Sequence, residues 1–178
     1  HSSPITAPTG LNPGDQYRLA FVTASQRDPS SSNIADYNAF VTATANTQAA
    51  LLALGRVWTA TASTNSVDAR DNTGTNPFNA THADAPIYLL DGATKIADNN
   101  ADLWDGSLDH ALSVNETGGS VPLTLRTGSQ ADGTATPGNG LGTAGSTLMG
   151  FSTASGGDWI AAGTLGQTVH PAFLRPVR

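Results

Sequence analysis

Residues 33–54 have the pattern of a long helix, so the fold must contain at least one helix. Ser32 or Asn33 can cap its start. Its apolar side chains recur at helical spacing, at Ile34, Tyr37, Phe40 and Val41. Gly55 is a suitable end, and the polar pair Asn46-Thr47 predicts a break into two helices.

The rest of the chain is poor in residues that build helices. Thirteen of its fourteen acidic residues are Asp, and seven of its eight basic residues are Arg. Glu and Lys favour exposed helix faces, whereas Asp, Asn, Gly, Ser and Thr favour turns and caps. Thr and Ser together exceed a fifth of the residues, which is typical of exported bacterial surface proteins. We therefore expect few helices, long loops and an extracellular or cell-surface location.

Short β-rich segments flank the predicted helix. We expect strands over residues 17–23, 57–63, 85–90, 95–97, 121–127, 158–161 and 172–174. A short helix is predicted over 99–104, and loops over 66–81 and 128–147. A length of 178 residues fits one domain. The pattern predicts a proline-rich N-terminal arm over 1–16 and one α+β domain over 17–178, with short, mostly antiparallel strands and one or two N-terminal helices.

Three short motifs occur in an order that resembles a known family. Ala35-Asp36-Tyr37-Asn38-Ala39-Phe40 leads from an Ala-Asp-aromatic stretch to Phe; residues 85–89 precede Leu103-Trp104-Asp105-Gly106; and Leu125-Arg126-Thr127-Gly128 precedes further glycines. Together they resemble the endostatin-like branch of the C-type-lectin-like fold, with Leu125 or Arg126 where Trp is usual. Residues 32–41 are also similar to exported bacterial proteins that bear a C-terminal sorting signal. The resemblance implies a C-type-lectin/endostatin-like fold over roughly residues 17–175.

Composition excludes several classes of function. No apolar run approaches the ~18 residues that a membrane span needs, so we expect no membrane insertion. The net charge of −6 repels a phosphate backbone, so we expect no nucleic-acid partner. Without cysteine, neither a disulfide scaffold nor a thiolate zinc site is possible.

The densest acidic run, residues 98–109, predicts a metal site. Asp98, Asn100 and Asp102 alternate, and Asp109 stands at the twelfth position. Calcium prefers six to eight hard oxygen ligands, so these four residues are the predicted ligands of Ca²⁺. The sixth position is Leu103, however, where an EF-hand has Gly. The alternative is a short capped helix with Leu103 and Trp104 in the core and the aspartates in water.

No catalytic motif stands out. A serine hydrolase needs Ser, His and an acid that meet in space, and no Gly-x-Ser-x-Gly elbow occurs. Glu116 is the sole Glu, which argues against a glycosidase with a Glu acid. The three tryptophans lie in apolar stretches and are expected in the core.

The leading hypothesis is a non-catalytic extracellular binding or adhesion module, stabilised by calcium, whose ligand is a glycan or a surface polymer. The calcium-dependent sugar signature Glu-Pro-Asn or Gln-Pro-Asp is absent, so direct sugar binding through calcium is not expected. The alternative is a secreted hydrolase whose residues meet only in the fold, with His82, His110 and His170 as suspects. A purely structural surface component is a third reading.

Overall fold

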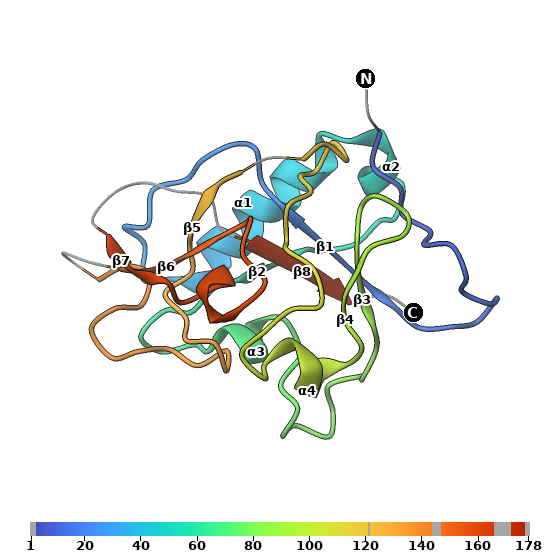
Figure 1. Cartoon of the computed structure of the whole chain (residues 1–178). Helices are drawn as coiled ribbons and strands as arrows, with labels where there is room; N and C mark the ends of the chain where they lie inside the picture. The colour runs from blue at the N-terminus through green and yellow to red at the C-terminus, as the bar shows by residue number, and fades with distance from the viewer. Residues whose placement is uncertain (1–2, 121, 144–146, 166–171, 177–178) are drawn as a thin grey trace.

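The computed structural model describes residues 3–120, 122–143, 147–165 and 172–176. Its helices are short: α1 (Ile34–Asn46), α2 (Ala49–Leu52), α3 (Ala69–Asn72), α4 (Asn100–Leu103) and the 3₁₀ turn η1 (Gly157–Trp159). Its strands are β1 (Arg18–Val22), β2 (Thr59–Thr61), β3 (Ile87–Leu89), β4 (Lys95–Ala97), β5 (Thr124–Arg126), β6 (Thr147–Phe151), β7 (Gly163–Leu165) and β8 (Ala172–Pro176). Long irregular segments join them (Figure 1).

The strands form two sheets. The larger has the order β2-β8-β1-β3-β4, and the smaller has the order β5-β6-β7. The pair β1–β3 is parallel, and the other named pairs are antiparallel. The α+β class and the mostly antiparallel pairing are therefore confirmed.

The predicted N-terminal helix forms where its pattern placed it, and it breaks at the predicted point. Asn33 caps α1 with a side chain that accepts a hydrogen bond from Ala35 N at 3.1 Å. α1 ends at Asn46, α2 follows, and Gly55 then takes a φ of 59°, which glycine adopts readily. Asn38 on α1 accepts a hydrogen bond from Ala60 N at 2.8 Å, which fixes the helix against β2.

One apolar core lies between the helices and the sheets. All three tryptophans belong to it, as expected. Trp58 packs edge-on against Phe21, with ring centroids 4.9 Å apart, and Trp104 lies 5.8 Å from Trp159. The second pair links α4 to η1, and so anchors the short helix of the acidic run to the interior.

Three sequence expectations are wrong or incomplete. The strand predicted over 158–161 is wrong: residues 157–159 form the turn η1, in which Trp159 N donates to Gly156 O and Ile160 N to Gly157 O, so these amides do not pair with a strand. The turn packs directly against β6, since a Cβ on Gly150 would lie 2.1 Å from Trp159 O. The loop predicted over 66–81 contains α3, and β6 and β7 were not expected. These elements are three to five residues long, too short for a periodic signal.

The N-terminal segment lies against the turn between β3 and β4. Ile5 N donates to Leu90 O at 2.9 Å, and Thr9 N donates to Gly92 O at 2.8 Å. The Ile5 side chain lies so close to Gly92 that a Cβ there would approach it to 2.7 Å. The separation into an arm over 1–16 and a domain over 17–178 stays a prediction.

Candidate functional site

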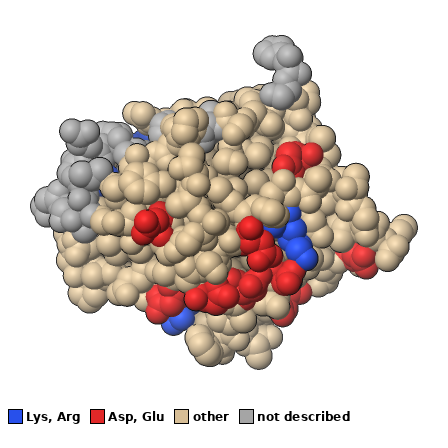
Figure 2. Space-filling view, in the orientation of Figure 1, with Lys and Arg blue, Asp and Glu red and all other residues tan. Residues whose placement is uncertain are grey.

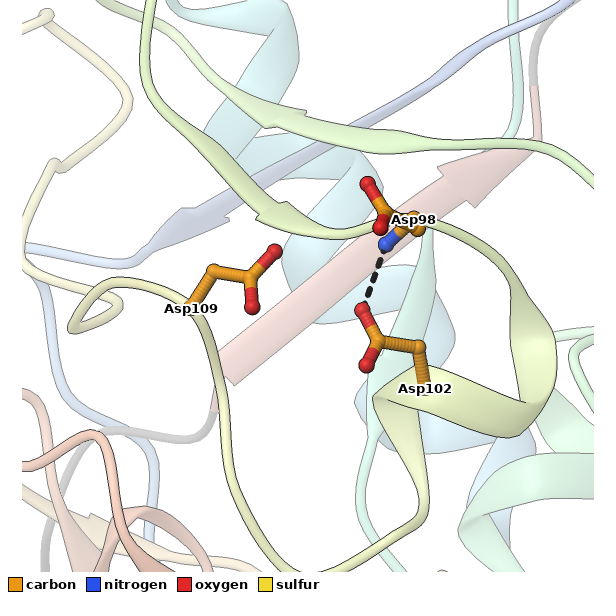
Figure 3. Close-up of side chains that lie close together, drawn as sticks. All are labelled: Asp98, Asp102 and Asp109. Atoms are coloured by element: carbon orange, nitrogen blue, oxygen red, sulfur yellow. Dashed lines mark hydrogen bonds between the residues drawn. The ribbon is translucent and has the colours of Figure 1, made fainter.

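Three of the four predicted metal ligands meet at one place. Asp98 directly follows β4, Asp102 lies on α4, and Asp109 lies in the loop beyond. One carboxylate oxygen from each lies within 4.8 Å of the others. Figure 3 shows the three side chains between the end of β4, α4 and that loop. We call these residues the Asp cluster.

Backbone hydrogen bonds position the Asp cluster. Asp98 N donates to Asp102 Oδ2 at 2.7 Å (Figure 3). Asp109 N donates to Ile96 O at 2.9 Å, which holds the third aspartate beside β4. Asn99 caps α4 by accepting from Asp102 N at 2.9 Å. The cluster is therefore held by the strand and the helix cap and not by contacts among the carboxylates themselves.

The capped helix that the sequence offered as an alternative is also present. Leu103 is fully buried and Trp104 nearly so, while Asp98 and Asp109 are exposed. Trp104 Nε1 donates to Thr75 Oγ1 at 2.9 Å, which fixes the end of α4. The helix and the acidic cluster are thus two parts of one arrangement.

A lysine already neutralises part of the cluster's charge. Lys95, at the start of β4, forms an ion pair with Asp98. The hydrogen bond to Asp98, and then the charges of Asp98 and Asp109, raise the pKa of Lys95 above its usual value. Both partners are well exposed, with side chains 39% and 59% accessible, so water screens the pair and it adds little stability.

The cluster has the chemistry to hold a metal ion. Three carboxylates gathered within 4.8 Å repel one another, and a cation between them relieves that repulsion. Their oxygens are hard ligands of the kind that group 2 cations prefer. Asp98 and Asp109 are open to solvent, so water can complete the coordination.

Asn100, the fourth predicted ligand, does not join the cluster. It is buried, with 3% of its surface exposed. Its Nδ2 donates to Ala83 O at 3.2 Å, and its backbone N donates to Asp84 Oδ1 at 2.7 Å. Asn100 and Asp102 are two residues apart on α4, and residues two apart do not share a helix face. The side chain of Asn100 therefore lies away from that of Asp102.

Asn100 instead lines a polar cavity of about 400 Å³ on the other side of α4. The wall comes from the loop before β3 and from the start of α4: Asn76, Pro77, Asn79, Ala80, His82, Ala83, Asp84, Asn100 and Ala101. We call this the loop cavity. Sequence reasoning named His82 as a suspect but missed the asparagines, whose one visible signal was their density in a predicted loop.

The three suspect histidines are not brought together among the described residues. His82 lines the loop cavity, and His110 is exposed beside Asp109. His170 lies outside the described residues. No serine or threonine is among the described residues that line the loop cavity, so His82 and Asp84 both line it without a hydroxyl nucleophile in the same lining.

Acidic side chains gather in a band on the face shown in Figure 2, over the region of α3 and α4. The band follows from the composition, because the chain has fourteen acidic and eight basic residues. A surface of this sign attracts cations and repels anionic ligands.

The function of the Asp cluster and the loop cavity has to be inferred from the residues that form them. No helix in the part of the chain that the structure describes has the length and apolar character needed to cross a membrane. Compared with protein-family models and with curated proteins, the chain matches none.

Proposed function

We propose that this chain is a non-catalytic extracellular binding or adhesion module in which Asp98, Asp102 and Asp109 hold a stabilising Ca²⁺ ion. The convergence of three carboxylates from separate segments carries the calcium assignment. The sequence resemblance to the endostatin-like branch and the Asp- and Asn-rich loops support the binding role. The proposed ligand is a glycan or an extracellular surface polymer.

The chemistry of the cluster suits calcium better than magnesium. Ca²⁺ takes six to eight oxygen ligands in a flexible geometry, whereas Mg²⁺ demands a near-ideal octahedron. Three carboxylates with oxygens within 4.8 Å of one another can supply part of such a flexible shell, and water can supply the rest.

Exposure and Lys95 set the expected affinity. Two of the three aspartates are open to water, and Lys95 competes for Asp98. Extracellular calcium modules bind with Kd of about 0.1–1 mM, and we expect the same range here. At a concentration of about a hundred times Kd, an ion that binds only the folded state raises the free energy of unfolding by about 2.7 kcal/mol.

The test is a thermal melt in 10 mM Ca²⁺, in 10 mM Mg²⁺ and in chelator. We expect calcium to raise Tm by several degrees and magnesium to raise it less. Asp102→Asn and Asp109→Asn should abolish the calcium shift. Asp15→Asn, on the exposed N-terminal segment, makes the same change in net charge and should retain it. An equal shift in all three variants, or none in the original chain, would refute the calcium site.

Lys95→Gln provides a test in the opposite direction. It removes the competing ammonium from Asp98 and leaves the carboxylates in place. Calcium affinity, measured by titration calorimetry, should therefore rise several-fold. A fall in affinity would show that the ion does not bind next to Lys95.

A secreted hydrolase is the second proposal, and it is favoured by the presence of both a histidine, His82, and a carboxylate, Asp84, in the lining of the loop cavity. Replacing each suspect histidine, His82, His110 and His170, by Ala separates the two functions. A hydrolase would lose turnover of fluorogenic ester and glycoside substrates by orders of magnitude at one of these positions. A binding module would show no turnover to lose.

A further inference from the structure

We infer that the loop cavity binds the ring of a neutral sugar, with His82 and Asn79 as its hydrogen-bonding groups and with the exposed ring of Phe78, between two of the lining residues in the chain, as its apolar surface. This inference rests on the proposed binding function and specifies its ligand and site. The site is separate from the Asp cluster, so no calcium–sugar contact is involved.

The loop that forms the cavity is held in shape by its own hydrogen bonds. Asn76 N donates to His82 Nδ1 at 3.0 Å, and Phe78 N donates to Asn76 Oδ1 at 3.0 Å. Asn76 Nδ2 donates in turn to Asp71 Oδ1 at 2.7 Å. A cavity built this way is largely formed before a ligand arrives, and its volume of about 400 Å³ lies in the usual range for small-molecule sites.

His82 and Asn79 leave a donor without an acceptor. Both nitrogens of the His82 ring face N–H groups. Nδ1 lies 3.0 Å from the backbone N of Asn76, and Nε2 lies 3.2 Å from Nδ2 of Asn79. The Asn79 amide cannot turn over freely, because its Oδ1 accepts from the N and Oγ1 of Thr81. Whichever ring nitrogen carries the proton, that N–H points at another donor. A ligand oxygen beside Asn79 and His82 would supply the missing acceptor.

Asn100 closes the inner wall of the cavity. Its Nδ2 donates to Ala83 O at 3.2 Å, and its Oδ1 is buried with almost no surface that a ligand could reach. Asn100 therefore holds the wall in place, and the acceptor that the cavity lacks is the one beside His82 and Asn79. A hydroxyl group can supply it, and a sugar ring carries several hydroxyl groups on one rigid frame.

Phe78 supplies an apolar surface beside these polar groups. The side chain is 83% exposed, and both of its chain neighbours, Pro77 and Asn79, line the cavity. The Arg70 guanidinium lies 5.5 Å from its ring centroid and steadies the ring from one face. The electron-rich face of an aromatic ring attracts the C–H groups that line one face of a pyranose.

Charge selects a neutral sugar over an anionic one. Asp84 is exposed on the cavity wall, and the acidic band of Figure 2 spreads over the same part of the molecule. Uronic acids and sulfated sugars would be repelled there.

The test is an amide NMR titration of the calcium-loaded chain, up to 50 mM, with the methyl glycosides of glucose, galactose, mannose and N-acetylglucosamine. Glucuronic acid and galactose 6-sulfate are the charged comparisons. We expect at least one neutral glycoside to shift the amides of residues 76–84 and 100–101 with a millimolar Kd. The charged sugars should shift them at least five-fold less.

Variants at Phe78 test the stacking surface without disturbing the core. Phe78→Ala should weaken binding at least five-fold, and Phe78→Trp should restore it. Val57→Ala, at another exposed apolar residue (70% accessible), should leave binding unchanged. An unchanged affinity in Phe78→Ala, or no shift in the loop cavity with any neutral glycoside, would overturn the inference. Shifts mapped to another surface would overturn this site and leave the proposed function standing, and the calcium melt tests that function independently.

Discussion

The two sides of α4 carry polar groups of similar chemistry that are held in opposite ways. On the loop-cavity side, Asn100 is buried and bonded to Ala83. On the other side, Asp98 and Asp109 are exposed, and their carboxylates repel one another. The buried side therefore contributes to stability in the absence of any ligand, whereas the repulsion on the acidic side is relieved when a cation is bound. A helix of four residues can thus be a structural element on one side and a binding element on the other.

The largest effect is expected from the anchor that both sides share. Leu103→Ala should lower the free energy of unfolding by about 2–5 kcal/mol, because it leaves a cavity under α4. Urea unfolding measures this loss. The calcium shift in Tm should shrink as well, since Asp102 lies on α4. A loss below 1 kcal/mol would mean that α4 is not fixed to the core.

Asn100→Ala tests the buried side directly. It removes the hydrogen bond to Ala83 O, but it also removes the unpartnered Oδ1. We expect a net loss of about 1 kcal/mol in the free energy of unfolding. Calcium affinity should stay unchanged, because Asn100 faces away from the cluster. A reduced calcium affinity would contradict the separation of the two sides.

Asp109→Asn tests the acidic side in the absence of calcium. It removes one of three like charges and with it two repulsive pairs, each worth about 1 kcal/mol at 4 Å in water. In chelator, the free energy of unfolding should therefore stay the same or rise by up to about 2 kcal/mol. A clear loss in chelator would mean that Asp109 stabilises the fold without calcium, and the contrast between the two sides would fail.

The smallest effect concerns Lys95, whose raised pKa reports on the cluster. A raised pKa in the folded state means that the ion pair stabilises the fold below the unfolded pKa of about 10.4, and that this contribution is lost as the pH rises through the folded pKa. Calcium adds positive charge and competes for Asp98, so it should lower the pKa of Lys95 toward its usual value. Lys95 is the sole lysine, so an NMR titration of its side chain can be read directly. No change on adding calcium would place the ion elsewhere.

Local signals predicted the parts of the fold that depend on local chemistry. The cap at Asn33, the apolar spacing of α1 and the stop at Gly55 all act within a few residues, and each was visible in the sequence. The elements that were missed depend on contacts between distant segments. η1 packs directly against β6, and no pattern within residues 157–161 carries that information.

The candidate site was predicted in part for the same reason. The density of aspartates identified Asp98, Asp102 and Asp109, but the alternation that added Asn100 applies to an extended loop. A helix at this point turns Asn100 to the opposite side. The loop cavity could not be predicted at all, because its wall joins Asn76 and His82 to a helix that follows two strands later.

The place of β8 in the larger sheet has a consequence for how the chain folds during synthesis. β8 lies between β1 and β2, and residue 22 pairs with residue 172. β8 is the last of the five strands of this sheet to be synthesised, so β1 and β2 each keep an unpaired edge until then. Such long-range pairing makes folding slow and leaves strand edges exposed to aggregation. Deletion of residues 172–176 would therefore leave β1 and β2 without the strand that lies between them.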